Sequence, residues 1–163
     1  MADLQDVLQA YASHHRSRFN NICHWVGIPC ISLSTLAITH WLYIGVDGLT
    51  LSCNWLILAA CLIYYYRLDH SLALIMALAM LPLTATLSML VGPAPTPIAA
   101  YWLMGLFFSG WAIQFIGHLF EYKRPAFMDN LGQLAVAPLY ILCKIIIALG
   151  KRKDLQRTLA FYK

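Results

Sequence analysis

Four long apolar runs separated by short turns restrict what this chain can fold into. They cover Ile22–Val46, Leu49–Tyr66, Ser71–Val91 and Ile98–Phe120. A helix of about 20 mostly apolar residues crosses the hydrocarbon core of a bilayer, where only helices and closed barrels satisfy their backbone polar groups. Hydrophobic residues make up 61% of the chain and charged residues 11%, unlike the composition of a soluble domain. We therefore predict an all-α, integral membrane helical bundle with about four transmembrane helices.

Turns and two shorter segments complete the predicted bundle. Asp47–Gly48 is a turn dipeptide, and the three prolines of Gly92–Pro97 prevent a helix there. Apolar side chains recur at helical spacing from Leu4 to Tyr11, which predicts an N-terminal amphipathic helix. Leu134–Leu149 is apolar but short, and we interpret it as a C-terminal re-entrant or interfacial helix.

The basic residues predict the orientation in the membrane. With four spans, all eleven Lys and Arg residues lie on one side, and the opposite loops, 46–50 and 92–97, carry none. The positive-inside rule makes that side cytoplasmic, so we expect both termini in the cytoplasm. A fifth span would export the basic group at 151–157. A bacterial chain would lie in the inner membrane and a eukaryotic one in the endoplasmic reticulum.

Several other functions lack support in the sequence. The net charge is +4, but the basic residues are scattered as expected beside anionic lipid headgroups, which argues against nucleic-acid binding. The five cysteines form no C-x-x-C pair. No glycine-rich phosphate loop and no G-x-S-x-G motif occur. Lacking a linker or repeat, residues 1–163 are interpreted as a single membrane-embedded domain.

Two polar clusters interrupt this apolar chain. In the first, Gln114, His118 and Glu121 are spaced i, i+4 and i+7, so they project from one face of a helix. The second runs from residue 11 to 24 and contains His14, His15 and His24. The partners of the first face are therefore expected in the second cluster.

The predicted spans bring these histidines to one depth. His24 opens the first span and His118 closes the fourth, while His14 and His15 precede the first span on the same side. His40 lies toward the other side. Nine residues separate His15 from His24, a rotation of about 180° on a continuous helix. Both can line one site only if the chain breaks between them, and residues 16–21 are a plausible place.

Together the histidines suggest a metal site. A lone histidine at a membrane interface is more often a headgroup contact or a helix cap, but grouped polar residues facing a bundle interior are usually functional. Histidine and carboxylate at i, i+3, as in His118 and Glu121, is a spacing with which bundle helices present a metal. A three-histidine or two-histidine-one-carboxylate site suits Fe(II) and oxygen, and zinc remains an alternative.

The two clusters resemble the Mpo1-like family, formerly a domain of unknown function. The matching segments are His15-(x)4-Asn20-(x)3-His24-Trp-Val-Gly-Ile-Pro29 and Gln114-Phe-Ile-Gly-His118-(x)2-Glu121-(x)3-Pro125-Ala126, followed by Asp129-Asn130 and Pro138. Their order, separation and intervening hydropathy agree, so the resemblance covers nearly the whole chain. Ser17-Arg18 stands where the family commonly has Asn-Pro, which leaves open whether His14 or His15 is the ligand.

The resemblance implies an Fe(II)-dependent dioxygenase that uses O2 to shorten 2-hydroxy long-chain fatty acids by one carbon, as in phytosphingosine breakdown. The implied iron-site histidines are His15, His24 and His118. The supporting polar residues of the catalytic site are Glu121, Asn20 and Asp129.

Further residues near this layer are candidates for binding the substrate. They are Arg16, Arg18, Gln114, Lys123 and Arg124. The four basic ones could attract the carboxylate, although anchoring to lipid headgroups is the commoner role of such residues. Two alternatives remain: a non-catalytic lipid-binding or membrane-organising protein, and a transporter, which the absence of broken helices in matched halves disfavours.

Overall fold

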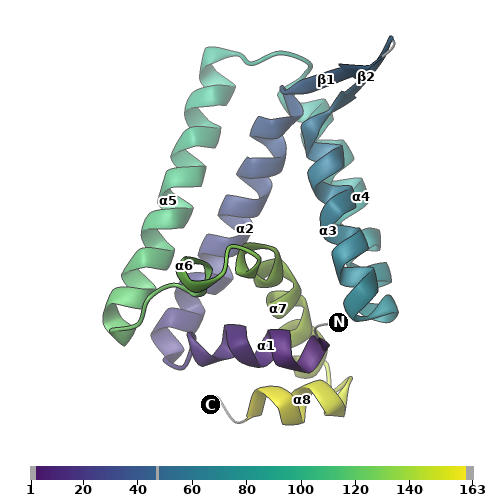
Figure 1. Cartoon of the computed structure of the whole chain (residues 1–163). Helices are drawn as coiled ribbons and strands as arrows, with labels where there is room; N and C mark the ends of the chain where they lie inside the picture. Colours follow the sequence, from purple (N-terminus) through teal and green to yellow (C-terminus); the bar gives the residue numbers. More distant parts are fainter. Residues whose placement is uncertain (1–2, 47, 161–163) are drawn as a thin grey trace. The chain divides into compact units, whose positions relative to one another are not determined.

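The computed structural model describes residues 3–46 and 48–160, which form helices and one two-stranded hairpin (Figure 1). In chain order the elements are α1 (Leu4–Ser13), α2 (Arg18–His40), β1 (Tyr43–Val46), β2 (Leu49–Ser52), α3 (Cys53–Leu68), α4 (His70–Val91), α5 (Pro97–Glu121), α6 (Ala126–Asp129), α7 (Gln133–Ala148) and α8 (Lys153–Ala160). The predicted all-α class is therefore confirmed apart from the hairpin.

Among the described helices, three are long and apolar enough to cross a membrane, namely α2, α4 and α5. Their lengths of 23, 22 and 25 residues meet the requirement of about 20 residues. α3 has only 16 residues, so the fourth span remains a prediction. Helices also form at the predicted terminal segments, as α1 and α7, but their placement at a membrane surface is likewise still a prediction.

The β-hairpin is a correction to the predicted spans. The run Ile22–Val46 predicts a spanning helix of about 20 residues and Leu49–Tyr66 a second span, yet the end of the first run and the start of the second form β1 and β2, which pair antiparallel with Tyr43 opposite Ser52. Aromatic and β-branched residues favour strands over helices. Gly48 has a φ of +86°, which glycine adopts without strain, so it serves the predicted turn. Asp47, its predicted partner in that turn, lies outside the described residues.

The chain divides into two compact units, one of residues 1–28 with 111–163 and one of residues 29–110. Helices α2 and α5 contribute residues to both units. The single domain expected from the sequence stays a prediction.

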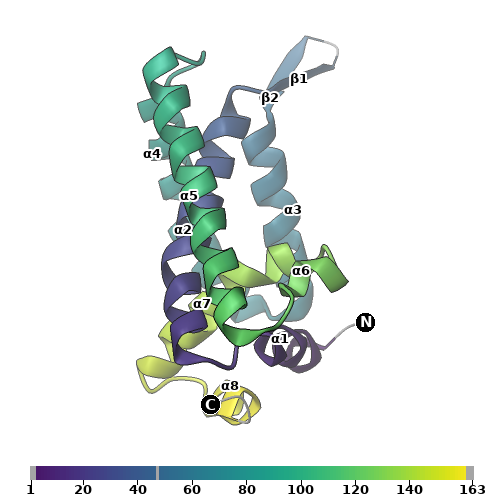
Figure 2. The same cartoon turned by 90° about the vertical axis from the view of Figure 1, so that its left-hand side faces the viewer.

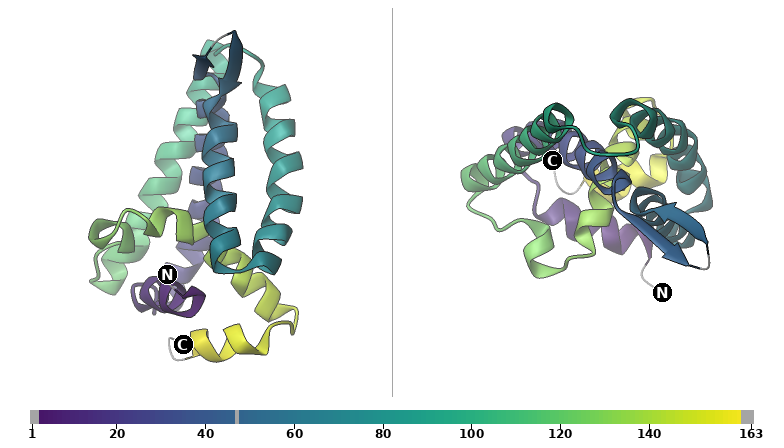
Figure 3. Two further views of the ribbon diagram at one scale, coloured as in Figure 1. Left: turned by 45° about the vertical axis from the view of Figure 1, so that its right-hand side comes forward. Right: turned by 90° about the horizontal axis from the view of Figure 1, so that it is seen from above.

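The unit of residues 29–110 is built around the α3–α4 hairpin, whose helices run side by side (Figure 3). The side chain of Asp69 accepts a hydrogen bond from the Leu72 backbone N–H at 2.9 Å and so caps α4. At the other end of these two helices, the Asn54 side-chain amide of α3 donates to Ser88 Oγ of α4 at 2.9 Å, which ties α3 to α4. These polar contacts fix the register of two otherwise apolar helices.

In the other unit, α1, α7 and α8 pack against one another (Figure 2). Their fully buried side chains include Leu8, Leu139, Cys143 and Leu155. The apolar face predicted for α1 is thus covered by protein. Lys144 of α7 donates a hydrogen bond to Asn21 Oδ1 at 2.7 Å, which ties α7 to the start of α2.

Candidate metal centre

The chain breaks between α1 and α2, as the spacing of His15 and His24 required. α1 ends at Ser13 and α2 begins at Arg18, so His15 lies in the connecting segment. Its backbone N–H donates to the Ala12 carbonyl at 3.0 Å, closing the last turn before the break. The break lets His15 and His24 face one another rather than opposite sides of a helix.

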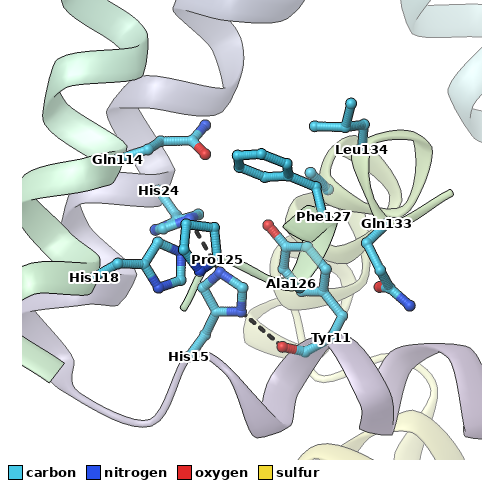
Figure 4. Close-up of a pocket in the computed structure, with 11 residues that line it drawn as sticks. Tyr11, His15, His24, Gln114, His118, Pro125, Ala126, Phe127, Gln133 and Leu134 are labelled. Atoms are coloured by element: carbon cyan, nitrogen blue, oxygen red, sulfur yellow. Dashed lines mark hydrogen bonds between the residues drawn. The ribbon is translucent and has the colours of Figure 1, made fainter. Parts of the chain in front are cut away.

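Three imidazoles from three elements meet in this unit (Figure 4). His15 comes from the connecting segment, His24 from α2 and His118 from α5, and the three residues are only 1%, 4% and 4% exposed. Their ring centroids lie 4.2 to 5.0 Å apart. One ligand nitrogen of each lies within 4.8 Å of the others, so this group could hold a metal ion.

Backbone carbonyls fix the tautomers of two of these rings. His15 Nδ1 is 2.6 Å from the Tyr11 carbonyl oxygen, and His24 Nδ1 is 2.9 Å from that of Asn20. A carbonyl only accepts, so each Nδ1–H is the donor and each neutral ring presents a bare Nε2 lone pair. The two Nε2 atoms lie 3.0 Å apart. Two lone pairs at this distance repel unless a cation lies beside both.

The distance suits a metal ion. Bonds of about 2.0–2.1 Å that meet at a right angle separate two nitrogen atoms by about 3 Å. Nδ1 of His118 is buried and has no hydrogen-bond partner among the described residues. A buried polar atom normally has a partner, so this nitrogen is left unsatisfied by the protein. The three imidazoles therefore form a group that could hold a metal ion.

Burial also keeps His15 neutral. The pKa of His15 is lowered to about 2, mainly because burial disfavours the charged ring and secondly because His24 is nearby. Metal ions bind neutral imidazole. At neutral pH this ring is thus in its ligand form.

Glu121 does not face the lone pairs but holds the segment that carries His15. Its carboxylate accepts hydrogen bonds from the backbone N–H groups of Arg16 and Ser17, the latter at 2.5 Å, and from the Asn20 side-chain amide. These backbone donors lie just before α2, where a helix N-terminus favours negative charge. The amide of Asn20 also donates to the His14 carbonyl at 3.2 Å. Through these hydrogen bonds, Glu121 and Asn20 hold the end of α5 against the segment between α1 and α2. We call this pair the clamp.

His14 turns away from the three-histidine group. Its Nδ1 is 3.1 Å from the Arg124 carbonyl oxygen, and its Nε2 is 3.5 Å from a carboxylate oxygen of the exposed Asp129. Of the two adjacent histidines, the structure therefore brings His15 into the group. Asp129 lies beside His14 rather than beside the three imidazoles.

A small pocket adjoins the histidines, with a volume of about 20 Å³. It is lined by Tyr11, His15, His24, Gln114, His118, Pro125, Ala126, Phe127, Gln133, Leu134 and Ala137. Of the predicted substrate-binding residues, Gln114 lines it. Arg16, Arg18, Lys123 and Arg124 do not line it and are exposed.

The walls from α1, α6 and α7 were missed by reasoning from the sequence. Phe127 and Leu134 had no polar signature, and Tyr11, although it opens the second polar cluster, was given no role in the site. Its position four residues before His15 was the available signal, because residues so spaced share a helix face. The pKa of the Tyr11 phenol is raised, mainly by burial and secondly by the nearby Tyr140, so the hydroxyl keeps its proton.

A buried group of three histidines, set among apolar helices, defines a candidate metalloprotein of the membrane. Residues 1–149 match the family described as "2-hydroxy-palmitic acid dioxygenase Mpo1-like". A curated relative, the 2-hydroxy-palmitic acid dioxygenase MPO1 of Saccharomyces cerevisiae, is 30% identical over 161 residues, covering 98% of this chain and 88% of the relative. No solved structure matches the chain. The chain belongs to the Mpo1-like family, as the two histidine segments predicted.

Proposed function

We propose that this protein is an Fe(II)-dependent dioxygenase that shortens 2-hydroxy long-chain fatty acids by one carbon. The observation that carries the proposal is the pair of Nε2 lone pairs 3.0 Å apart, with both tautomers fixed by carbonyls and a third imidazole beside them. The name of the yeast relative supports the substrate class. The overall reaction balances as 2-hydroxypalmitic acid plus O2 giving pentadecanoic acid, CO2 and water.

His15, His24 and His118 would hold the iron. Bound there, Fe(II) would activate O2 and offer open positions to the hydroxyl and carboxylate oxygens of a substrate. The carbonyls of Tyr11 and Asn20 keep two of the rings in the ligand tautomer.

The surroundings would protect and orient the reaction. Glu121 and Asn20 fix the segment that carries His15. Phe127 and Leu134, in the pocket wall, exclude water from the reacting end of the substrate. An acyl chain would find apolar surroundings beyond the pocket, as expected for a membrane enzyme.

Iron content tests the ligand set. After anaerobic loading with Fe(II), we expect close to one iron per chain in the unmodified protein and almost none in His24→Ala or His118→Ala. His40→Ala is the matched control, because His40 contacts Ser52 and Tyr43 in the other unit. Equal iron content in all three variants would refute the histidine assignment. Incubation with 2-hydroxypalmitate and O2, followed by mass analysis for pentadecanoic acid, tests the activity.

The main rival is a non-catalytic lipid-binding or membrane-organising protein. In that case the histidines would cap helices and contact headgroups, and the purified protein would take up no iron even under anaerobic loading. The facing Nε2 lone pairs disfavour this reading, because neither nitrogen has a donor from its histidine partner.

The topology is part of the proposal. α3 would be the fourth span, with both termini in the cytoplasm and the whole chain acting as one membrane-embedded domain. The charge bias supports this arrangement, since the loops at 46–50 and 92–97 carry no Lys or Arg. The site would then face the cytoplasmic leaflet, in the inner membrane of a bacterium or the endoplasmic reticulum of a eukaryote.

A further inference from the structure

Tyr11 is held firmly against the metal centre. It lies in the last turn of α1 and is only 3% exposed. Its ring stacks on His15 with centroids 4.2 Å apart and planes 13° apart, and it packs against Tyr140 at 4.8 Å. Its backbone carbonyl accepts the Nδ1–H of His15.

None of these contacts requires a hydroxyl. A phenylalanine would stack on His15 and would offer the same backbone carbonyl. A buried tyrosine hydroxyl normally has a hydrogen-bond partner, and leaving it without one costs free energy. Among the described residues no group forms a hydrogen bond with the Tyr11 hydroxyl, and its oxygen is not sealed from solvent, so it opens into the pocket that Tyr11 lines. The partner of this hydroxyl is therefore a water or a ligand atom in the pocket.

The hydroxyl is aimed at the place where such a partner would enter. Tyr11 lines the pocket beside the histidines, and Figure 4 shows its phenol oxygen on the side of the ring that faces this pocket. A volume of about 20 Å³ is the space of about one water-sized group, so a single carboxylate oxygen fits beside the hydroxyl and an alkyl chain does not.

We propose that the Tyr11 hydroxyl donates a hydrogen bond to the carboxylate of a bound 2-hydroxy acid, an inference that rests on the function proposed above. A carboxylate is a strong acceptor, and the hydrogen bond that it accepts from an O–H group is charge-assisted. Tyr11 would thus orient the carboxylate while its backbone orients His15. Tyr11 would therefore bind the substrate through its hydroxyl and hold the His15 ring through its backbone carbonyl.

Binding to the cobalt-substituted protein tests this role without turnover. The visible absorption of Co(II) in the site is followed while 2-hydroxypalmitate is added to the unmodified protein, Tyr11→Phe and Tyr140→Phe. Tyr140→Phe is the matched control, because Tyr140 is a buried neighbour of Tyr11 that does not line the pocket. We expect about tenfold weaker binding in Tyr11→Phe only, the effect of losing one hydrogen bond to a charged group.

A second ligand separates binding from packing. Hexadecane-1,2-diol retains the 2-hydroxyl group and has an alcohol in place of the carboxylate. An alcohol oxygen accepts only a neutral hydrogen bond, so the affinity of the diol should fall less than that of the acid in Tyr11→Phe. The Co(II) content and melting temperature should be unchanged.

The inference alone is overturned if the unmodified protein binds Co(II) and 2-hydroxypalmitate and Tyr11→Phe binds both equally well. Equal weakening for acid and diol, or loss of Co(II) from Tyr11→Phe, also overturns it, because Tyr11 would then act only through packing or through His15. An unmodified protein that binds no metal refutes the proposed function itself, and the inference with it.

Discussion

Gly117 is the position at which one added methyl group should disturb the metal centre most. A Cβ built on it would lie 2.5 Å from Asn20 Oδ1, 2.9 Å from Cys23 Cβ and 3.3 Å from Asn20 Cα. Asn20 Cα is a backbone atom and Cys23 Cβ is bonded directly to the backbone, so these two atoms move only if α2 moves. Gly117→Ala therefore requires α2 and α5 to separate locally.

The size of this displacement follows from the same contacts. To reach ordinary contact at 3.4 Å, the 2.9 Å distance to Cys23 Cβ must increase by about 0.5 Å. His24 follows Cys23 in α2, and His118 follows Gly117 in α5, so the shift falls directly on two proposed ligands. Metal–nitrogen distances in a site hold to about 0.2 Å, so we expect at least tenfold weaker metal binding.

The same substitution should destabilise the fold by about 1–3 kcal/mol, the usual cost of overpacking. Metal affinity is measured by competition with a chelator, and stability by thermal unfolding in detergent. Gly105→Ala is the matched control, since Gly105 is also a glycine of α5 but no described atom lies within 4 Å of its Cβ position. The reasoning is refuted if Gly117→Ala binds metal as tightly as Gly105→Ala and melts at the same temperature.

Two further predictions concern the clamp and the topology. Glu121→Ala should destabilise the protein by about 1.5–3 kcal/mol and weaken metal binding, because the backbone N–H groups of Arg16 and Ser17 lose a charged acceptor. Thermal unfolding and metal titration check this against Asp154→Ala, which removes an exposed carboxylate paired with Arg152, away from the histidines, and an equal effect of the two variants would contradict it. Single cysteines introduced at Lys151 and Thr96, in a background in which the native cysteines are replaced, should be labelled from opposite sides of the membrane. Labelling of both from one side would exclude the four-span arrangement.

A common depth for several of the histidines could be predicted because a bilayer would fix depth. His24 opens one predicted span and His118 closes another. In a membrane the ends of such spans lie at the same depth, a constraint that a soluble chain does not have. The rotation between His15 and His24 then required a break, and the structure has it between Ser13 and Arg18. Periodicity and depth placed His14 and His70 in the same layer as well, and the choice of His15, His24 and His118 came from the resemblance to the family.

The role of Glu121 could not be read in the same way. Its i+3 spacing from His118 is typical of a metal ligand, whereas its oxygens accept hydrogen bonds from the backbone of the segment before α2. Helical spacing shows which side chains share a face but not which backbone groups from elsewhere reach them. For the same reason the sequence did not indicate that Tyr11 contributes its carbonyl to His15.

The hairpin was missed because strand and helix compete closely in short apolar segments. Tyr43–Val46 and Leu49–Ser52 are as apolar as the helices beside them, so hydropathy alone extended both neighbouring spans. Only pairing between the two segments, a non-local contact, favours the strands. This pairing shortens α3 to 16 residues and leaves its membrane crossing to be tested.

The carbonyls that hold His15 and His24 have a consequence for biogenesis. Each lies four residues before its own histidine, so both rings can be preset during synthesis as soon as the nearby helical turns form. The third imidazole emerges only after the hairpin, α3, α4 and most of α5 have been made. A nascent chain would therefore expose two prepared nitrogens long before it can enclose an ion, and metal capture would mark the completion of α5 rather than guide the insertion of α2.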